Sequence, residues 1–109
     1  MMLKVVVENQ EFAIQIPDAV LNNGEDFFRK MDQDMDKGWL MSREWVENPS
    51  RLQRCQIAAD KIADALSTHN ETLAHLMAGY IVTRMPRVTE VHIDTEGEMS
   101  ETQLIEAAS

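Results

Sequence analysis

Apolar and polar residues alternate near the start of the chain with a period of two, as they do in a β-strand with one buried face. The alternation runs through residues 3–7 and resumes in residues 12–16, and the polar residues Asn9 and Gln10 separate the two runs. This pattern predicts a β-hairpin, which Pro17 ends.

From Glu25 onward, spacings of three and four residues replace the alternation, which is typical of an amphipathic helix. The inner stripe of this predicted helix consists of four large apolar residues: Phe28, Met31, Met35 and Trp39. Gly38 weakens the last turn, because glycine is a poor helix former. We therefore expect a helix that begins at Glu25 and buries this stripe.

Two further helices carry starting signals. Asn48 can cap the first of them, with Pro49 at the first helical position, and a capping box from Ser50 to Gln53 is the alternative start. The second helix, residues 70–84, is apolar on most of its sides. We expect it to be the central and most buried helix.

Alternation returns in residues 88–93 and predicts a third strand, with Thr89, Val91 and Ile93 on one face. A polar loop follows, and a capping box that starts at Ser100 favours a last short helix.

The order strand, strand, helices, strand predicts an α+β fold. We expect a small antiparallel sheet, made of the N-terminal hairpin and the C-terminal strand, that three helices cover. The predicted single domain spans residues 1–94. Residues 95–109 are expected to form an acidic C-terminal tail or a short helix.

The composition narrows the choice of partners. The chain has 109 residues, of which 44% are apolar, and this is enough for one core. Its 19 acidic residues outnumber its 10 lysines and arginines, and the formal net charge is −9. Such a surface repels nucleic acid phosphates and anionic membranes, so we expect neither as a partner. The longest nearly apolar run, residues 73–82, is about half as long as a membrane-spanning helix needs to be.

Cys55 is the only cysteine, so no intramolecular disulfide is expected. The apolar run in residues 1–8 is too short for a secretory signal, and both observations favour the reducing cytoplasm. Cys55 falls in register with the apolar residues of its predicted helix. We interpret it as a buried, inert side chain rather than a nucleophile paired with His69 or His75.

Motifs of catalysis are not found in the sequence. It contains no glycine-rich phosphate loop, no GXSXG elbow, and no HEXXH or CysXXCys spacing. We therefore predict neither a zinc site nor an enzyme from the sequence.

One stretch resembles a known metal-binding loop. Three aspartates stand at every second position and a glycine follows, which is similar to the Ca²⁺ loop of the EF-hand family. Lys37 intrudes where the EF-hand has its glycine, and this moves the rest of the motif one place late. The resemblance implies a Ca²⁺-binding protein with a degenerate loop at residues 32–44, whose ligands would be Asp32, Asp34, Asp36 and Glu44.

The same three aspartates have an alternative interpretation. The helix predicted from Glu25 runs through them, so its apolar stripe would face the core while the acids face water. In that arrangement Asp32 and Asp36 share a face and repel each other mildly. The helical periodicity favours this alternative over the loop.

The segment after the aspartates holds more large apolar side chains than one helical face can bury. Five of them fall within eight positions: Trp39, Leu40, Met41, Trp45 and Val46. Aromatic residues and methionine are enriched in the cores of protein interfaces. We predict that these five residues form an interaction surface for a protein partner or for a second copy of the chain. The sequence thus favours a small interaction or accessory domain that self-associates.

Overall fold

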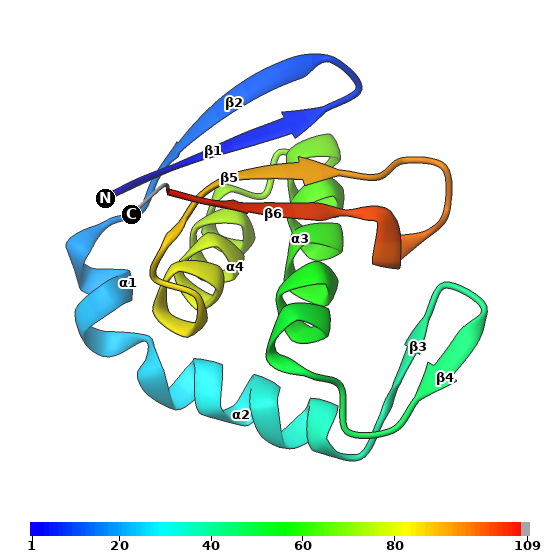
Figure 1. Cartoon of the computed structure of the whole chain (residues 1–109). Coiled ribbons are helices and arrows are strands. Elements are labelled where there is room, and N and C mark those ends of the chain that lie inside the picture. The colour runs from blue at the N-terminus through cyan, green and yellow to red at the C-terminus, as the bar shows by residue number, and fades with distance from the viewer. Residues whose placement is uncertain (108–109) are drawn as a thin grey trace.

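A computed structural model describes residues 1–107 and shows helices packed against one side of a β-sheet, with a small hairpin beside them (Figure 1). Residues 108 and 109, the end of the predicted C-terminal tail, lie outside the described residues. The elements in chain order are β1 (Met2–Val7), β2 (Gln10–Gln15), α1 (Asp18–Asn23), α2 (Glu25–Asp36), β3 (Trp39–Met41), β4 (Glu44–Val46), α3 (Arg51–Ser67), α4 (Glu71–Arg84), β5 (Val88–Ile93), the 3₁₀ helix η1 (Met99–Glu101) and β6 (Gln103–Glu106).

The main sheet has the strand order β2-β1-β5-β6, which confirms the α+β class. Glu8 and Asn9, both with positive φ (51° and 67°), join β1 to β2 in the antiparallel hairpin that the alternation predicts. The sheet is mixed rather than antiparallel as predicted, because β5 runs parallel to β1. The helices between these strands return the chain to the end of the sheet at which β1 begins, so β5 starts in the same direction.

Helices cover one face of the main sheet and bury the inward side chains of its strands (Figure 1). Leu3 and Val5 of β1 and Val91 of β5 have no exposed surface. α4 is deeply buried, as the sequence predicts, since residues 77–82 are all buried.

The inward face of β5 differs from the prediction at one residue. Thr89 is exposed and Val88 is buried, because the register of β5 against β6 shifts between Val88 and Glu90. Such an irregularity lets two apolar residues that are three apart, Val88 and Val91, face the same core.

α3 begins at the capping box from Ser50 to Gln53, which is the alternative start that the sequence predicts. The Ser50 hydroxyl accepts from the Gln53 backbone N–H (3.2 Å), and the Gln53 side chain accepts from the Ser50 N–H (2.8 Å). Asn48 does not cap the helix, because its side-chain oxygen accepts from Arg54 instead (2.9 Å).

The end of the chain forms a strand where a short helix is predicted. β6 pairs antiparallel with β5, and η1 precedes it. The Gln56 side-chain amide donates to the carbonyls of Ser100 and Thr102, both at 3.1 Å, and this fixes the extended entry into β6. Pairing with the edge of β5 and the two hydrogen bonds from Gln56 both favour an extended backbone. Together they outweigh the local helix signal at Ser100.

In residues 1–107, the structure contains no helix with the length and apolarity that crossing a bilayer requires.

Candidate functional site

The aspartates of the EF-hand resemblance lie in the second half of α2 rather than in a loop. α2 extends to Asp36, and Phe28 and Met35 on its inner face are buried. This is the helical arrangement that the periodicity favours. Asp34 is exposed on the same helix. Glu44 lies on β4, the second strand of the hairpin that follows α2.

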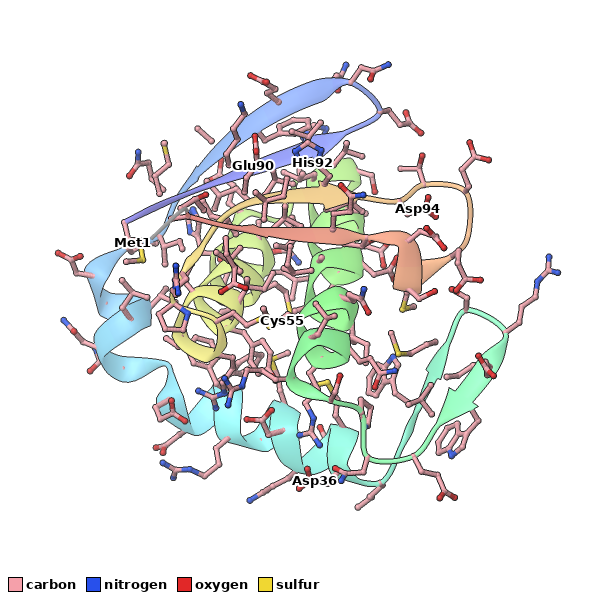
Figure 2. The ribbon with its side chains drawn as sticks, viewed as in Figure 1. Met1, Asp36, Cys55, Glu90, His92 and Asp94 are labelled. Carbon is pink, nitrogen blue, oxygen red and sulfur yellow. The ribbon has the colours of Figure 1, made fainter. Side chains whose placement is uncertain are left out.

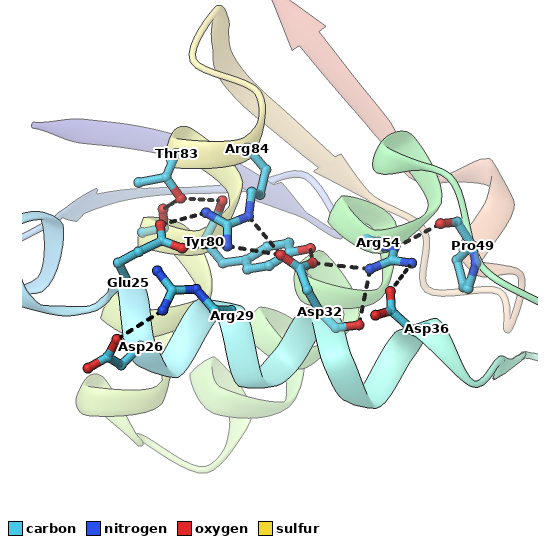
Figure 3. A network of polar contacts seen from close by, with 11 residues as sticks. Glu25, Asp26, Arg29, Asp32, Asp36, Pro49, Arg54, Tyr80, Thr83 and Arg84 are labelled. Carbon is cyan, nitrogen blue, oxygen red and sulfur yellow. Dashed lines mark hydrogen bonds and ion pairs between the residues drawn. The ribbon is translucent and has the colours of Figure 1, made fainter.

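Asp32 is at the centre of a polar network that joins three helices (Figure 3). Its Oδ1 accepts from the Tyr80 hydroxyl at 2.5 Å and from Arg54 Nη1 at 3.3 Å. Its Oδ2 accepts from Arg84 Nε at 3.0 Å. Burial by itself would raise the pKa of Asp32, but the hydrogen bonds from Tyr80, Arg84 and Arg54 outweigh it, so the pKa lies below its ordinary value.

The two arginines of this network also bind a second carboxylate each. Arg54 donates to Asp36 at 2.8 Å, and Arg84 forms two bonds with the Glu25 carboxylate at 2.8 and 3.0 Å. Burial, followed by the hydrogen bond to Asp32, raises the pKa of the Tyr80 hydroxyl far above its usual range. The network therefore ties α2 to α3 and α4, and its donors already serve internal carboxylates.

These contacts bear on the predicted Ca²⁺ ligands. Arginine donors already occupy carboxylate oxygens of Asp32 and Asp36, and Asp36 projects at the C-terminal end of α2 (Figure 2). Within residues 1–107, no three histidine, cysteine or acidic side chains are gathered as a metal site would require. The helical alternative predicts that these acids do not bind Ca²⁺, and titration with the ion decides between the two interpretations.

The structure brings the five predicted interaction residues together on the β3–β4 hairpin. β3 pairs antiparallel with β4, so that Trp39 lies opposite Val46 and Leu40 lies opposite Trp45. Met41 is buried, and Trp39 and Val46 are half-buried. Leu40 and Trp45 alternate with these inward residues and face away from the core.

Leu40 and Trp45 form an exposed apolar pair on the outer face of this hairpin. Their relative exposures are 55% and 58%, although both side chains are large and apolar. Cross-strand neighbours of this kind lie close enough to form one continuous contact surface. We call this pair the outer hairpin face.

Three contacts hold the hairpin in place against the body of the protein. Met41 is packed in the core, and the Ser42 hydroxyl at the tip accepts from the Met99 backbone N–H at 2.9 Å. At the root, the ammonium group of Lys61 lies 5.1 Å from the centre of the Trp39 ring. The hairpin is therefore a fixed platform rather than a loop.

An apolar pocket of about 160 Å³ lies beside the root of the hairpin. Its walls include Phe27, Met31, Trp39 and Leu73. Phe27 is 42% exposed, and Trp39 lines the pocket from the inner face of the hairpin, so this surface is separate from the outer hairpin face.

Cys55 has no exposed surface and lies inside the molecule, as the sequence predicts (Figure 2). Burial raises the pKa of its thiol to about 12, so the thiolate is scarce at neutral pH. This is the environment of an inert core side chain.

No family model, curated protein or solved structure matches this chain. The site is therefore interpreted from its own geometry.

Sequence reasoning did not find the partners of Asp32. Arg54 and Arg84 are 22 and 52 residues away along the chain, so no local pattern connects them to it. One signal was present, because Asp32 has the same helical spacing as Phe28 and Met35 and so lies toward their buried face. A carboxylate at such a position requires a cationic or hydroxyl partner.

Proposed function

We propose that this protein is a small cytoplasmic interaction domain that associates with a second copy of itself through the outer hairpin face. The observation that carries the proposal is the exposed cross-strand pair of Leu40 and Trp45 on a hairpin whose inner face is anchored in the core. The single buried Cys55 is consistent with a reducing compartment.

The chemistry of the pair supports an interface. Tryptophan is among the residues that contribute most to binding when an interface buries them, because its large rigid surface leaves water at low entropic cost. The indole ring of Trp45 is held in place because it rests on the backbone of Gly38. A preorganised aromatic side chain loses little conformational freedom on binding.

Charges on the hairpin favour a second copy in an antiparallel, face-to-face arrangement. Arg43 and Glu44 are exposed at the tip, and Lys37 and Glu47 are exposed at the base. Within residues 1–107 none of the four takes part in an ion pair. Two hairpins stacked tip to base bring Arg43 of each copy near Glu47 of the other, and Glu44 near Lys37.

The net charge of −9 restricts where two copies can meet. Most approaches bring acidic surfaces together and are unfavourable. The outer hairpin face is apolar and carries charges of both signs at its ends, so repulsion between two copies is low there. A contact confined to one short hairpin is small. We therefore expect a weak dimer whose population depends on protein concentration.

Sedimentation velocity over a wide concentration range tests the proposal. The wild type is expected to shift toward the dimer as concentration rises, and the variants Leu40→Ser and Trp45→Ser are expected to stay monomeric. Leu52→Ser is the matched control, since Leu52 is 45% exposed but lies on α3, outside the hairpin. A wild type that is monomeric throughout, or an equal loss in Leu52→Ser, would contradict the proposal.

A further inference from the structure

The outer edge of β2 has backbone groups without a strand partner. Among residues 1–107, β2 pairs only with β1 and is the last strand on its side of the sheet. The Ile16 N–H donates to the Met1 carbonyl at 2.7 Å, which places Ile16 among the residues that bond toward β1. Because this direction alternates along a strand, Glu11, Ala13 and Gln15 direct their N–H and C=O groups away from the sheet.

The two edges of the sheet differ in how they are protected. β6, at the other edge, has only four residues, and the β5–β6 register shifts near its end. β2 has six residues in unbroken register. Its one charged residue, Glu11, lies on the sheet face, where it pairs with Lys4 at 3.0 Å. Proteins normally block long regular edges with proline, lysine or bulges, and β2 has none of these.

A groove of about 430 Å³ runs beside this edge, between β2 and the corner where α3 meets α4. Phe12 and Ile14 form its wall on the strand, and Leu66 and Ala74 form part of its wall on the helices. The pocket also touches Ala13, one of the residues with outward backbone groups. A groove with both apolar and polar walls thus adjoins an unpaired strand edge, as in sites that bind a peptide by strand addition.

We propose that β2 accepts an extended peptide segment of a partner protein as a fifth strand, with apolar and basic side chains alternating along the peptide. Only an extended backbone matches donors and acceptors that recur at every second residue. Apolar side chains on one face of the added strand fill the groove, and those on its other face lie over the open face of the sheet.

Charge around the edge accounts for the basic side chains. On the open face, Glu11 and Glu90 share one cation, Lys4, so that face carries an excess negative charge. Glu11 is 65% exposed beside the position of the added strand. Glu71 lines the groove together with two histidines, His69 and His75, and the whole chain carries −9. Lysine or arginine in the peptide is therefore attracted, and glutamate is repelled.

This surface is distinct from the outer hairpin face, so the inference goes beyond the proposed function. β2 lies at the top of the molecule in Figure 1, and the β3–β4 hairpin projects below the sheet at its side. The hairpin variants Leu40→Ser and Trp45→Ser are expected to bind peptide as the wild type does. Each proposal can therefore fail without the other.

The test uses the full chain, labelled with ¹⁵N, and a short synthetic peptide of alternating valine and lysine. We expect saturable amide shifts centred on Glu11, Ala13 and Gln15. Two matched peptides separate the contributions: one N-methylated throughout, which keeps side chains and charge but loses the backbone donors, and one of alternating valine and glutamate. We expect each to bind at least about tenfold more weakly.

A protein variant gives an independent readout. Ala13→Pro removes an outward N–H without removing a bond to β1, and edge strands tolerate proline at such a position. It is expected to weaken peptide binding about tenfold. The N-methylated peptide keeps the test decisive if this variant folds poorly.

Three results would overturn the inference. The first is equal affinity for the N-methylated peptide, which would mean that charge alone attracts it. The second is a set of amide shifts centred on the acidic loop at residues 94–101. The third is an absence of peptide binding together with a wild-type dimer that Ala13→Pro dissociates, which would make a second copy the occupant of the edge.

Discussion

The indole ring of Trp45 lies directly on the backbone of Gly38. A Cβ atom added at Gly38 would be 2.4 Å from Cζ2 of that ring, and Gly38 has a φ of +112°, which side chains rarely adopt. The glycine thus ends α2, turns the chain into β3, and gives Trp45 the surface on which its ring rests. This contact positions the aromatic half of the outer hairpin face.

Gly38→Ala is expected to destabilise the protein by about 2–4 kcal/mol, because backbone strain adds to the clash with the ring. Urea unfolding measures the loss, and the shift of the Trp45 indole N–H signal reports displacement of the ring. Gly97→Ala is the matched control, since Gly97 also has a positive φ (88°) but a Cβ there would meet nothing within 4 Å. It should cost only about 1 kcal/mol. Equal losses in the two variants would show that the ring contact contributes nothing.

Asp32→Asn is expected to lower the free energy of unfolding by about 2 kcal/mol at neutral pH, because Tyr80, Arg54 and Arg84 lose their charged acceptor. Asp34→Asn changes the next acid of α2, which is exposed and has no ion pair within residues 1–107. It should have little effect. Chemical denaturation of the three proteins measures the difference.

The contribution of Asp32 should also depend on pH. Its pKa is lower in the folded protein than in the unfolded chain, so the unfolded chain binds the proton first as the pH falls. The stabilisation is therefore complete above the ordinary aspartate pKa of about 4. It is lost as the pH falls from there through the folded-state pKa. The difference in the free energy of unfolding between the wild type and Asp32→Asn should narrow over that acidic range. A constant difference would contradict the assignment of Asp32 as a charged acceptor in the folded protein.

The parts of the fold that sequence predicts well are those set by local pattern. Alternation fixes which residues of the β1–β2 hairpin face inward, and the Ser50 to Gln53 capping box fixes the start of α3. The local pattern fails at Trp39, which is predicted on the inner stripe of the helix from Glu25 but begins β3, because the helix ends at Asp36, ahead of Gly38.

The parts that sequence misses depend on contacts between distant segments. β3 and β4 have three residues each, too few for a visible alternation, and the bond from Met99 to Ser42 helps to hold them. The helix predicted at Ser100 is replaced by β6, because Gln56 binds the carbonyls at its entry. The partners of Asp32 come from α3 and α4 and leave no trace near it in the chain.

Titration with Ca²⁺ tests the EF-hand resemblance, with Mg²⁺ as the control ion. We expect no saturable amide shifts over residues 32–44, because residues 32–36 are helical and arginines already bind Asp32 and Asp36. Saturable shifts in this range that disappear in Asp34→Asn would instead establish a Ca²⁺ site.

Cys55 should not react with a thiol reagent such as DTNB while the protein is folded. Its side chain has no exposed surface, and burial raises the pKa of the thiol to about 12, so both access and thiolate are lacking. The reaction should become fast in urea. Rapid labelling of the native protein would show that the helices around Cys55 open readily.

The most direct test of the proposed function is a charge swap at the ends of the hairpin, followed by sedimentation equilibrium. Arg43→Glu removes the cation of the tip, which already carries Glu44, and is expected to weaken self-association at least about tenfold. The double variant Arg43→Glu/Glu47→Arg exchanges the two charges and should restore the affinity to within about threefold of the wild type. Restoration would establish that two copies meet tip to base across the outer hairpin face. An unchanged dimer in Arg43→Glu, or a double variant no better than the single one, would contradict it.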